Sequence, residues 1–546
     1  MVLIVLLTAL AISMATMPVM IRLAPYLRMV DLPDPRKVHA RAVPRIGGIA
    51  IILGAMASLL LWLPSEPWAR SYLIGSLVLL VFGAADDSME LGHYTKFVGQ
   101  IVAATAVVYW GGVWVSHLPF ISQPVPSEYG KVFTVFALVG VMNAINHSDG
   151  LDGLAGGEAL LSMGAAAYLA YLAGGTSVVL LAAAVAGGVF GFLRFNTHPA
   201  QVFMGDAGSQ FIGFSVGVLV VLLTQSANTS LSMALPALII GLPVVDILAV
   251  FGQRVQGGMN WFRATRNHIH HRLLDLGFQH HQVVVIIYSV QALLVSSAII
   301  AAYESDVAVL AIFAVVCSAV FAFLVVAERS GWRVNAGRSG QPPEAGAMTK
   351  GAALGRYFRA AAMQFIQATI PLYLLLGGLA TAQVPLDVAA VTVPVFAFAA
   401  LSLLVKSDPP RLMLLRLSLY LGAACEVFLW HGESGQLPEW ALAGEAVYFV
   451  MLAVAVAAAL RMAGADGFRT TPLDFLLAFV VVAAAALSDR VVAGSHLGAE
   501  VIVRLAVLFY ASELAITGRS TNASRVPQWS LIGVSLLLLG KALSLP

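Results

Sequence analysis

Long apolar segments recur along this chain, and short polar stretches separate each one from the next. Many come close to the roughly 20 residues that a helix needs to cross a bilayer. About eleven lie in the first part of the chain, at residues 2–20, 46–63, 71–85, 97–115, 131–147, 158–173, 176–193, 209–224, 232–252, 282–302 and 306–327. About seven more lie near residues 358–381, 384–405, 412–430, 441–460, 473–488, 497–516 and 528–545. The pattern predicts an all-α, polytopic membrane protein, because a helix satisfies its own backbone hydrogen bonds inside lipid.

The stretch at residues 328–356 differs from the apolar segments on both sides, because it is rich in Gly, Arg, Pro and Ser. This composition is typical of a flexible linker. We therefore expect a membrane domain at residues 1–327, a cytoplasmic linker at 328–356 and a second membrane domain at 357–546. The few acidic residues of the second domain have no spacing that suggests a site, so the sequence predicts no role for it.

The composition supports this assignment. Of 546 residues, 60% are hydrophobic and 11% are charged, against roughly 25% charged in soluble globular proteins. A soluble enzyme, a disulfide scaffold and a disordered regulator are therefore excluded. The net charge of +2 gives no field that would attract nucleic acid. The two cysteines, Cys317 and Cys425, both fall in apolar segments, so we expect neither a disulfide framework nor a thiolate metal site.

The basic residues predict how the segments are oriented. No positive region precedes the first apolar segment, and Arg22 and Arg28 follow it. We read this segment as a retained span with its N-terminus outside, not as a secretory signal. The loops after the odd-numbered segments of residues 1–327 then hold nearly all the basic residues of this part of the chain, and the opposite loops hold only Arg70 and Lys131. By the positive-inside rule, the basic loops face the cytoplasm.

Polar side chains collect at four of these cytoplasmic segment ends. The sequences are FGAADDS after the third segment, NAINHSDGLDGLAGG after the fifth, FNTHPAQVFMGDAGS after the seventh and RNHIHHRLLDLG after the ninth. Ionisable groups that converge at one membrane boundary suggest a functional site. The acidic residues lie at one face and not at the midplane, which favours an enzyme over a transporter, the main alternative. A non-catalytic scaffold is a third hypothesis.

The carboxylates of these motifs suggest chemistry on phosphates. Neighbouring carboxylates such as Asp86 and Asp87 repel each other unless a cation neutralises them. Oxygen ligands without thiolates favour Mg²⁺, with Mn²⁺ as the alternative, and Mg²⁺ usually completes its shell with water and substrate phosphates. Asp86, Asp87, Asp149 and Asp206 therefore predict a phosphate site.

Structural interpretations remain open for each motif. The paired aspartates could be a solvated helix end, and DGLDG could be a turn built on Asx hydrogen bonds. The three-residue spacing of Asn143, Asn146 and Asp149 keeps them near one helix face. The histidine cluster could bind zinc, but it lacks an HExxH helix. Histidines among Arg254, Arg263, Arg266 and Arg272 favour hydrogen bonds to a phosphate or sugar.

Taken together and in this order, the motifs in residues 1–327 resemble the polyprenyl-phosphate N-acetylhexosamine-1-phosphate transferase family. The family includes enzymes that initiate O-antigen, common antigen and teichoic acid linkage synthesis, and the loop HIHHRLLDLG looks like this bacterial branch. The resemblance implies transfer of a sugar 1-phosphate from a UDP-N-acetylhexosamine to polyprenyl (undecaprenyl) phosphate, with release of UMP and dependence on Mg²⁺. It also implies a bacterial inner membrane location with the site facing the cytoplasm. The oligomeric state stays open, a homodimer included.

The resemblance also implies roles for individual residues. The catalytic set is Asp86, Asp87, Asp149, Lys96, His270 and His271. The substrate-binding set is Lys37, Asn143, Asn146, Asp152, Asn196, Phe203, His268 and Arg266. The metal-binding set is Asp206, Asp149 and Asp86. Two departures, Thr265 where the family often has Asp and the stretch QGGMNWF, lie in the loop implied to contact the sugar, and they leave the identity of the hexosamine open.

Overall fold

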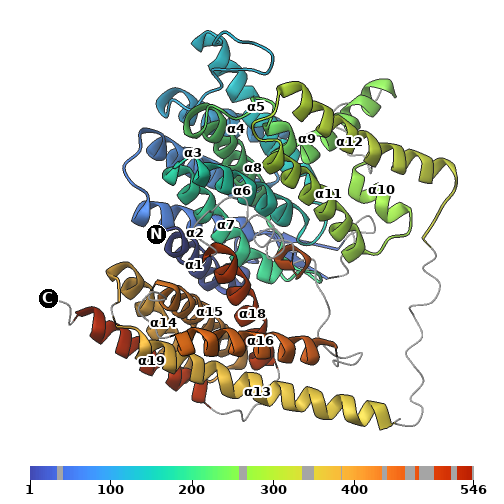
Figure 1. The fold of residues 1–546 in the computed structure, drawn as a ribbon. Helices are drawn as coiled ribbons and strands as arrows, with labels where there is room; N and C mark the ends of the chain where they lie inside the picture. The colour runs from blue at the N-terminus through green and yellow to red at the C-terminus, as the bar shows by residue number, and fades with distance from the viewer. Residues whose placement is uncertain are drawn as a thin grey trace. The chain divides into compact units, whose positions relative to one another are not determined.

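The computed structural model describes nine stretches of the chain, and these are almost entirely helical (Figure 1). The stretches are residues 1–33, 41–257, 267–334, 350–382, 384–432, 439–461, 474–478, 497–517 and 525–543. The strands in this part of the chain are β1 (Val30–Asp31) and β2 (Val43–Pro44), which pair antiparallel. The predicted all-α class is confirmed.

Each of the eleven apolar segments predicted in the first part of the chain forms a helix. These helices are α1 (Val2–Leu23), α2 (Gly47–Trp62), α3 (Pro67–Met89), α4 (His93–Thr105), α5 (Ser127–Ser148), α6 (Leu154–Leu172), α7 (Thr176–Asn196), α8 (Gly205–Leu222), α9 (Pro236–Gln256), α11 (His280–Ile300) and α12 (Asp306–Arg329). Two π-helical turns, η1 (Ala106–Trp110) and η2 (Leu223–Ala227), extend α4 and α8. The short helix α10 (Ile269–Asp275) was not predicted.

Most of the described helices have the length and apolarity that crossing a membrane requires. Among the described residues, twelve helices meet both criteria, and α2 and residues 388–404 form shorter apolar helices. Eight of the twelve lie within residues 1–334. The predicted polytopic membrane protein is therefore confirmed.

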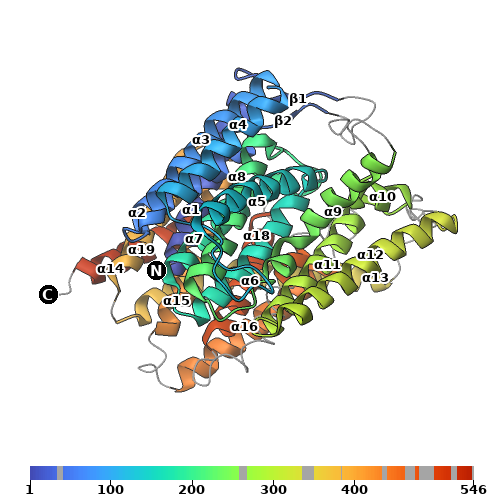
Figure 2. The ribbon, with the colours of Figure 1, turned by 90° about the horizontal axis from the view of Figure 1, so that it is seen from above.

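The chain divides by its contacts into two units, Met1–Ser339 with Thr471–Leu476 and Gly340–Thr470 with Leu477–Pro546. In the first unit, α8 is the central helix, because 94% of its most apolar 18-residue stretch is buried. It packs against α2, α3, α5 and α6 (Figure 2). A Cβ on Gly48 of α2 would lie 2.1 Å from the backbone nitrogen of Gly208, and one on Gly83 of α3 would lie 2.3 Å from Cα of Ala207. Glycine thus lets both helices approach the start of α8.

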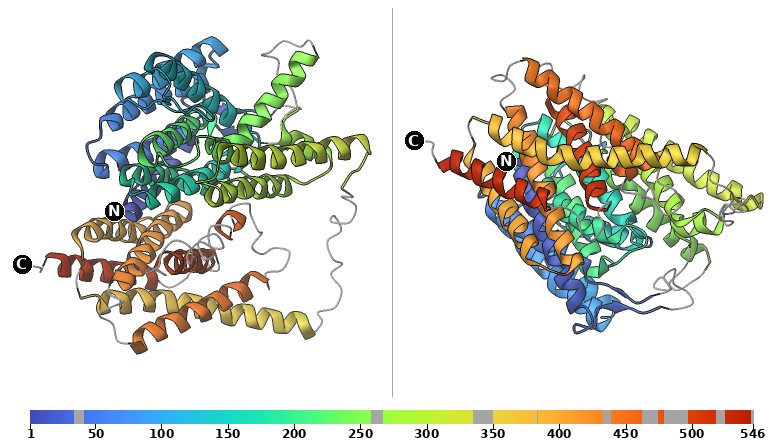
Figure 3. Two further views of the ribbon diagram at one scale, coloured as in Figure 1. Left: turned by 45° about the horizontal axis from the view of Figure 1, so that its top comes forward. Right: turned by 90° about the horizontal axis from the view of Figure 1, so that it is seen from below.

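The second unit contains six named helices in the part of the chain that the structure describes (Figure 3). They are α13 (Lys350–Ala380), α14 (Leu386–Leu404), α15 (Asp408–Gly432), α16 (Glu439–Arg461), α18 (Leu497–Thr517) and α19 (Val526–Leu543). Two partly buried ion pairs cross between its helices: Arg416 with Glu513 at 3.0 Å, and Arg504 with Glu445 at 3.1 Å. Of the predicted linker 328–356, residues 335–349 lie outside the described residues, and α13 already begins at Lys350.

Candidate active site

The last turn of α3 carries Asp86 and Asp87, and both are buried. Asp87 reaches the start of α8, where Oδ1 accepts the N–H of Asp206 at 2.8 Å and Oδ2 accepts the N–H of Ala207 at 3.1 Å. The first N–H groups of a helix have no partner within the helix, and a carboxylate there also favours the helix dipole. At Gly205, φ is +74°, and a Cβ would lie 2.6 Å from Oδ2 of Asp87. Asp87 therefore caps α8 from another helix and holds Asp206 in place.

Lys96, in the first turn of α4, joins two of the carboxylates. Its Nζ lies 2.6 Å from Oδ2 of Asp86 and 3.0 Å from Oδ2 of Asp206. Burial disfavours the ammonium ion, but the charge of Asp206 and the bond to Asp86 outweigh it, so the pKa of Lys96 is raised. The Nδ2 of Asn146, on α5, donates to Oδ1 of Asp206 at 2.6 Å and to Oγ of Ser209 at 2.8 Å. Four helices thus meet at Asp206.

The end of α5 separates the residues that the sequence grouped by spacing. Asn143 donates from Nδ2 to Oε1 of Gln100 at 2.8 Å, one helical turn away from the bond between Asn146 and Asp206. Asp149 follows the last residue of α5. Burial, aided by the negative charge of Asp206, raises the pKa of Asp149 to about 7. The structure thus brings Asn146 into contact with Asp206, whereas Asn143 binds the neighbouring α4.

The chain between β2 and α2 borders the same cluster. Arg45 pairs in parallel with Phe203 through the backbone. The Nη2 of Arg45 donates to the backbone oxygen of Asp87 at 3.4 Å, and its guanidinium lies 3.8 Å from the carboxylates of Asp31 and Glu90. The N–H of Phe203 donates to the backbone oxygen of Pro44 at 2.7 Å, and its own oxygen accepts the N–H of Gly47 at 3.0 Å. The predicted Phe203 is therefore held by its backbone against the chain between β2 and α2.

A second cluster ties the loop after α5 to the loop after α7. The Oδ2 of Asp152 accepts from Nδ1 of His198 at 2.7 Å and from the N–H of Ala200 at 3.1 Å. The Oδ1 of Asn196 accepts the N–H of Gly153 at 2.7 Å. The predicted residues Asp152 and Asn196 thus fix two loops against each other.

His280, at the start of α11, completes this second cluster. Its ring stacks on that of His198 with 4.3 Å between centroids, and its Nε2 lies 4.0 Å from Oδ2 of Asp152. One ligand atom from each of the three residues falls within 4.8 Å of the others, so the group could hold a metal ion. The 2.7 Å bond from His198 and the stacked rings are the geometry of a hydrogen-bonded cluster.

The predicted histidines surround the start of α10. Nδ1 of His268 lies within hydrogen-bond distance, 2.8 Å, of Oδ2 of Asp246. The N–H of Ile269 donates to Oδ1 of the same carboxylate at 2.9 Å. His270 is 3% exposed and lies against the DGLDG loop, because a Cβ on Gly150 would come within 2.2 Å of its Nε2. Burial lowers the pKa of His270 to about 3, so its ring is neutral at physiological pH.

The remaining predicted residues stand as follows. The ring of His271 lies 4.2 Å from that of His270. Lys37, Arg266 and the departure at Thr265 lie outside the described residues.

Four residues of these clusters were not predicted as site residues: Arg45, His198, Asp246 and His280. Arg45 looks in the sequence like one more basic residue of a cytoplasmic loop, and the two histidines lie outside the motif HIHH. Two of the four carry a usable signal: His198 lies inside the motif FNTHPAQVFMGDAGS, and Asp246 is a single carboxylate within an apolar segment, where an unpartnered charge is costly.

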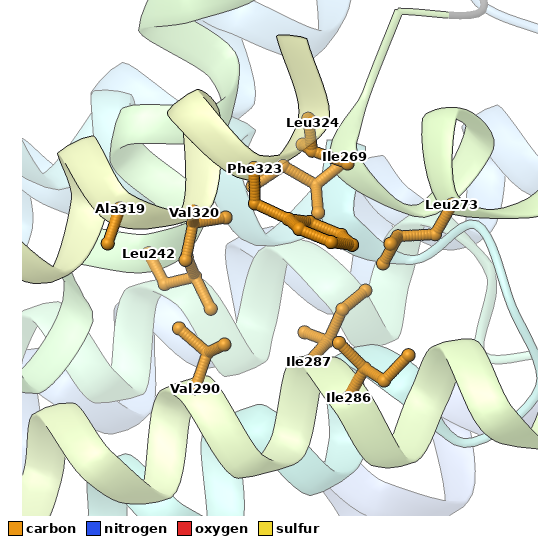
Figure 4. A pocket seen from close by; sticks show the side chains of 10 residues that line it. All are labelled: Leu242, Ile269, Leu273, Ile286, Ile287, Val290, Ala319, Val320, Phe323 and Leu324. Carbon is orange, nitrogen blue, oxygen red and sulfur yellow. The ribbon is translucent and has the colours of Figure 1, made fainter. Parts of the chain in front are cut away.

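An apolar pocket lies beside α10, along the side that carries Ile269 and Leu273 (Figure 4). It has a volume of about 270 Å³ and is lined by side chains of α9, α10, α11 and α12. Ile269 and Leu273, one turn apart on α10, point into it together with Phe323 and Ile287 (Figure 4). Burial of this apolar side fixes which way α10 faces.

Comparison with known proteins identifies the family. Residues 69–224 match the family model described as glycosyl transferase family 4, a range that includes the contacts among Asp86, Lys96 and Asp206. The chain is 33% identical over 290 residues to a probable undecaprenyl-phosphate N-acetylglucosaminyl 1-phosphate transferase of Bacillus subtilis (strain 168), with 52% of this chain and 80% of the relative covered. The chain belongs to the polyprenyl-phosphate hexosamine-1-phosphate transferase family.

Other relatives of this family member agree. It is 31% identical over 290 residues to the undecaprenyl-phosphate alpha-N-acetylglucosaminyl 1-phosphate transferase of Escherichia coli (strain K12), covering 52% of this chain and 79% of the relative. It is 34% identical over 303 residues to the decaprenyl-phosphate N-acetylglucosaminephosphotransferase of Mycobacterium leprae (strain TN), covering 49% of this chain and 75% of the relative. The resemblance seen in the motifs is confirmed, and the transporter hypothesis is not favoured.

Proposed function

We propose that this family member transfers N-acetylhexosamine 1-phosphate from a UDP-sugar to polyprenyl phosphate and releases UMP. The observation that carries the proposal is the contact of Lys96 with both Asp86 and Asp206, at the point where α3, α4, α5 and α8 meet. The carboxylates of Asp86, Asp87 and Asp206 outnumber the single ammonium ion of Lys96. The excess of negative charge suits a divalent cation that binds a phosphate.

The residues present fit Mg²⁺. The donors are carboxylate oxygens, which this hard cation prefers. Oδ1 of Asp86 is buried and has no hydrogen-bond partner among the described residues, although such atoms are usually paired. Asp86 and Asp206 would hold the ion, with Asp149 nearby, and Mn²⁺ could replace it. When bound, the ion would neutralise charge on the donor's pyrophosphate.

The chain's own residues would position the two substrates. Phosphoryl transfer needs mainly alignment and charge stabilisation. An oxygen of the lipid phosphate attacks the sugar-linked phosphorus of the donor, and the bond from that phosphorus to the UMP oxygen breaks. The ammonium ion of Lys96 would offset charge on the reacting phosphates. The N–H groups of Asp206 and Ala207 are occupied by Asp87. The start of α8 therefore serves as a rigid base for Asp206.

The substrates also suggest where the reaction takes place. Polyprenyl phosphate resides in the bilayer, whereas a nucleotide sugar is soluble, so they meet at the membrane boundary. The basic loops that flank the site motifs favour the cytoplasmic face. In a bacterium the enzyme would then lie in the inner membrane, where it would start a cell-envelope glycan such as O-antigen.

The test uses the full chain purified in detergent. UDP-GlcNAc, polyprenyl phosphate and Mg²⁺ are supplied, and UMP and the lipid-linked sugar are measured. We expect both products, their loss with EDTA and their return with added Mg²⁺ or Mn²⁺. A panel of UDP-sugars then identifies the donor. A well-folded sample that releases no UMP with any UDP-N-acetylhexosamine would overturn the proposal.

A further inference from the structure

A buried carboxylate and a histidine form a pair beside the proposed site. Asp246 lies within α9 and is 8% exposed, and His268 precedes the first residue of α10 and is 6% exposed. Their Oδ2 and Nδ1 atoms are 2.8 Å apart. The other oxygen of Asp246 accepts the N–H of Ile269 at 2.9 Å. Both oxygens of one carboxylate thus bind two successive residues at the start of α10.

This pair determines which nitrogen of His268 carries a proton. A carboxylate can only accept a hydrogen bond, so Nδ1 of His268 must donate. Nε2 is then the nitrogen that remains for a ligand. A carboxylate that orients an imidazole in this way fixes both its tautomer and its direction. Ile269 and Leu273, on the apolar side of α10, are buried and line the pocket, so rotation of the helix would expose apolar surface (Figure 4).

His268 also adjoins the elements that hold the carboxylate cluster. Its ring centroid lies 5.6 Å from that of His147, in the last turn of α5 and next to Asn146. Nδ1 of His147 donates a hydrogen bond to the backbone oxygen of Asn143 at 2.8 Å. The ring of His270 lies parallel to that of His268 at 5.7 Å, and it packs against Gly150. His268 therefore belongs to the wall of the site between α5 and α10.

We infer that Asp246 is a positioning residue for the proposed reaction. It holds His268 with a proton on Nδ1, so that Nε2 is directed to the sugar-phosphate part of the donor. The inference rests on the proposed function. Asp246 itself touches no substrate, and its effect passes through His268.

The test compares Asp246→Asn with wild type in the UMP release assay. If the asparagine keeps its oxygen on the N–H of Ile269, its NH₂ group faces Nδ1 of His268 and moves the ring proton to Nε2. The tether of α10 is largely kept, while the tautomer is reversed. Loss of a residue that orients another in this way typically costs about 10- to 100-fold. We expect kcat to fall by that factor, KM for the UDP-sugar to change little, and Asp246→Glu to recover part of kcat.

A double variant separates positioning from general damage. If Asp246 acts only through His268, Asp246→Asn adds no further loss to His268→Ala, because the effects of residues that act as a unit are not additive. Asp306→Asn is the matched control. Asp306 also accepts a side-chain and a backbone donor, Ser232 at 2.6 Å and Ala234 at 3.2 Å, but it lies at the start of α12 and outside the site. We expect wild-type kcat from this control.

The outcomes are distinguishable. An inactive but folded wild type overturns the proposed function and this inference with it. An active wild type with unchanged kcat in Asp246→Asn, or losses that add in the double variant, overturns this inference alone. If Asp246→Asn does not fold, Asp246→Glu is compared with His268→Ala in its place, and additive losses again count against the pair.

Discussion

The paired aspartates have different surroundings, although they are neighbours in the sequence. Both oxygens of Asp87 bind backbone N–H groups of α8, whereas Asp86 binds Lys96 and keeps one buried oxygen without a partner in the described part of the chain. The contacts of Asp87 are therefore those of a helix-capping residue. Asp86 has an oxygen available to bind a metal ion. The prediction that Asp87 is catalytic can therefore be tested against a structural role.

We predict that Asp87→Ala and Asp206→Asn fail in different ways. Loss of a capping side chain costs about 0.5–2 kcal/mol, so Asp87→Ala should lower the melting temperature in detergent. Asp206→Asn leaves the backbone cap intact and should abolish UMP release with little change in melting temperature. Thermal unfolding and UMP assays on both variants check this. Equal melting temperatures for Asp87→Ala and wild type would show that Asp87 does not cap α8.

His270 gives a prediction about pH. Its pKa is about 3 in the folded protein, against an ordinary value of 6.5, because burial disfavours the charged ring. The unfolded chain therefore binds this proton more readily, and folding is favoured most above pH 6.5. As the pH falls from 6.5 toward 3, stability should drop by up to about 1.4 kcal/mol per pH unit from this residue.

The matching measurement is thermal unfolding of wild type and His270→Gln between pH 7 and pH 4. Glutamine does not titrate in this range, so the melting temperature of the variant should depend less steeply on pH. Parallel curves for the two proteins would show that His270 does not make this contribution.

The element that organises the first unit is α8, because α2 and α3 both approach its start through glycine. We predict that Gly48→Ala is destabilising, since the new Cβ would lie 2.1 Å from backbone of Gly208, which cannot rotate away. Overpacking of this kind typically costs about 1–3 kcal/mol. Gly140→Ala in α5 is the control, because a Cβ there meets nothing within 4 Å. Alanine in an exposed helix position should be neutral or stabilising by about 0.5–1 kcal/mol. Melting temperatures in detergent that are equal for the two variants would contradict this.

The sequence predicts the helices better than the contacts between their ends. All eleven apolar segments of the first part form helices, because the bilayer sets their length and apolarity. The motifs also indicate the elements that meet at Asp206. Hydropathy does not encode which donor faces which acceptor. The cap from Asp87 to α8 and the bond from Asp246 to His268 each join residues more than twenty positions apart. The short helix α10 was missed because its seven residues are too few to show an apolar period.

At the scale of the whole molecule, the contacts that join Asp86, Lys96, Asn146 and Asp206 all lie within the first unit. The aligned part of the chain spans about half of its length, yet it covers 80% of the Bacillus subtilis relative. The second unit has ion pairs of its own, such as the partly buried pair of Arg416 with Glu513. These observations suggest that the first unit contains the proposed machinery.

We therefore predict that a chain truncated after Val334 keeps most of the wild-type kcat for UMP release. The truncation removes the second unit together with residues 335–339 and 471–476 of the first, and it leaves α1 to α12 intact. Both proteins are purified in detergent and compared at equal concentration, with the melting temperature as the control for folding. A truncated protein that still melts cooperatively but releases no UMP would show that residues 335–546 are needed for the reaction. Retained activity would instead show that the second unit is not needed for UMP release.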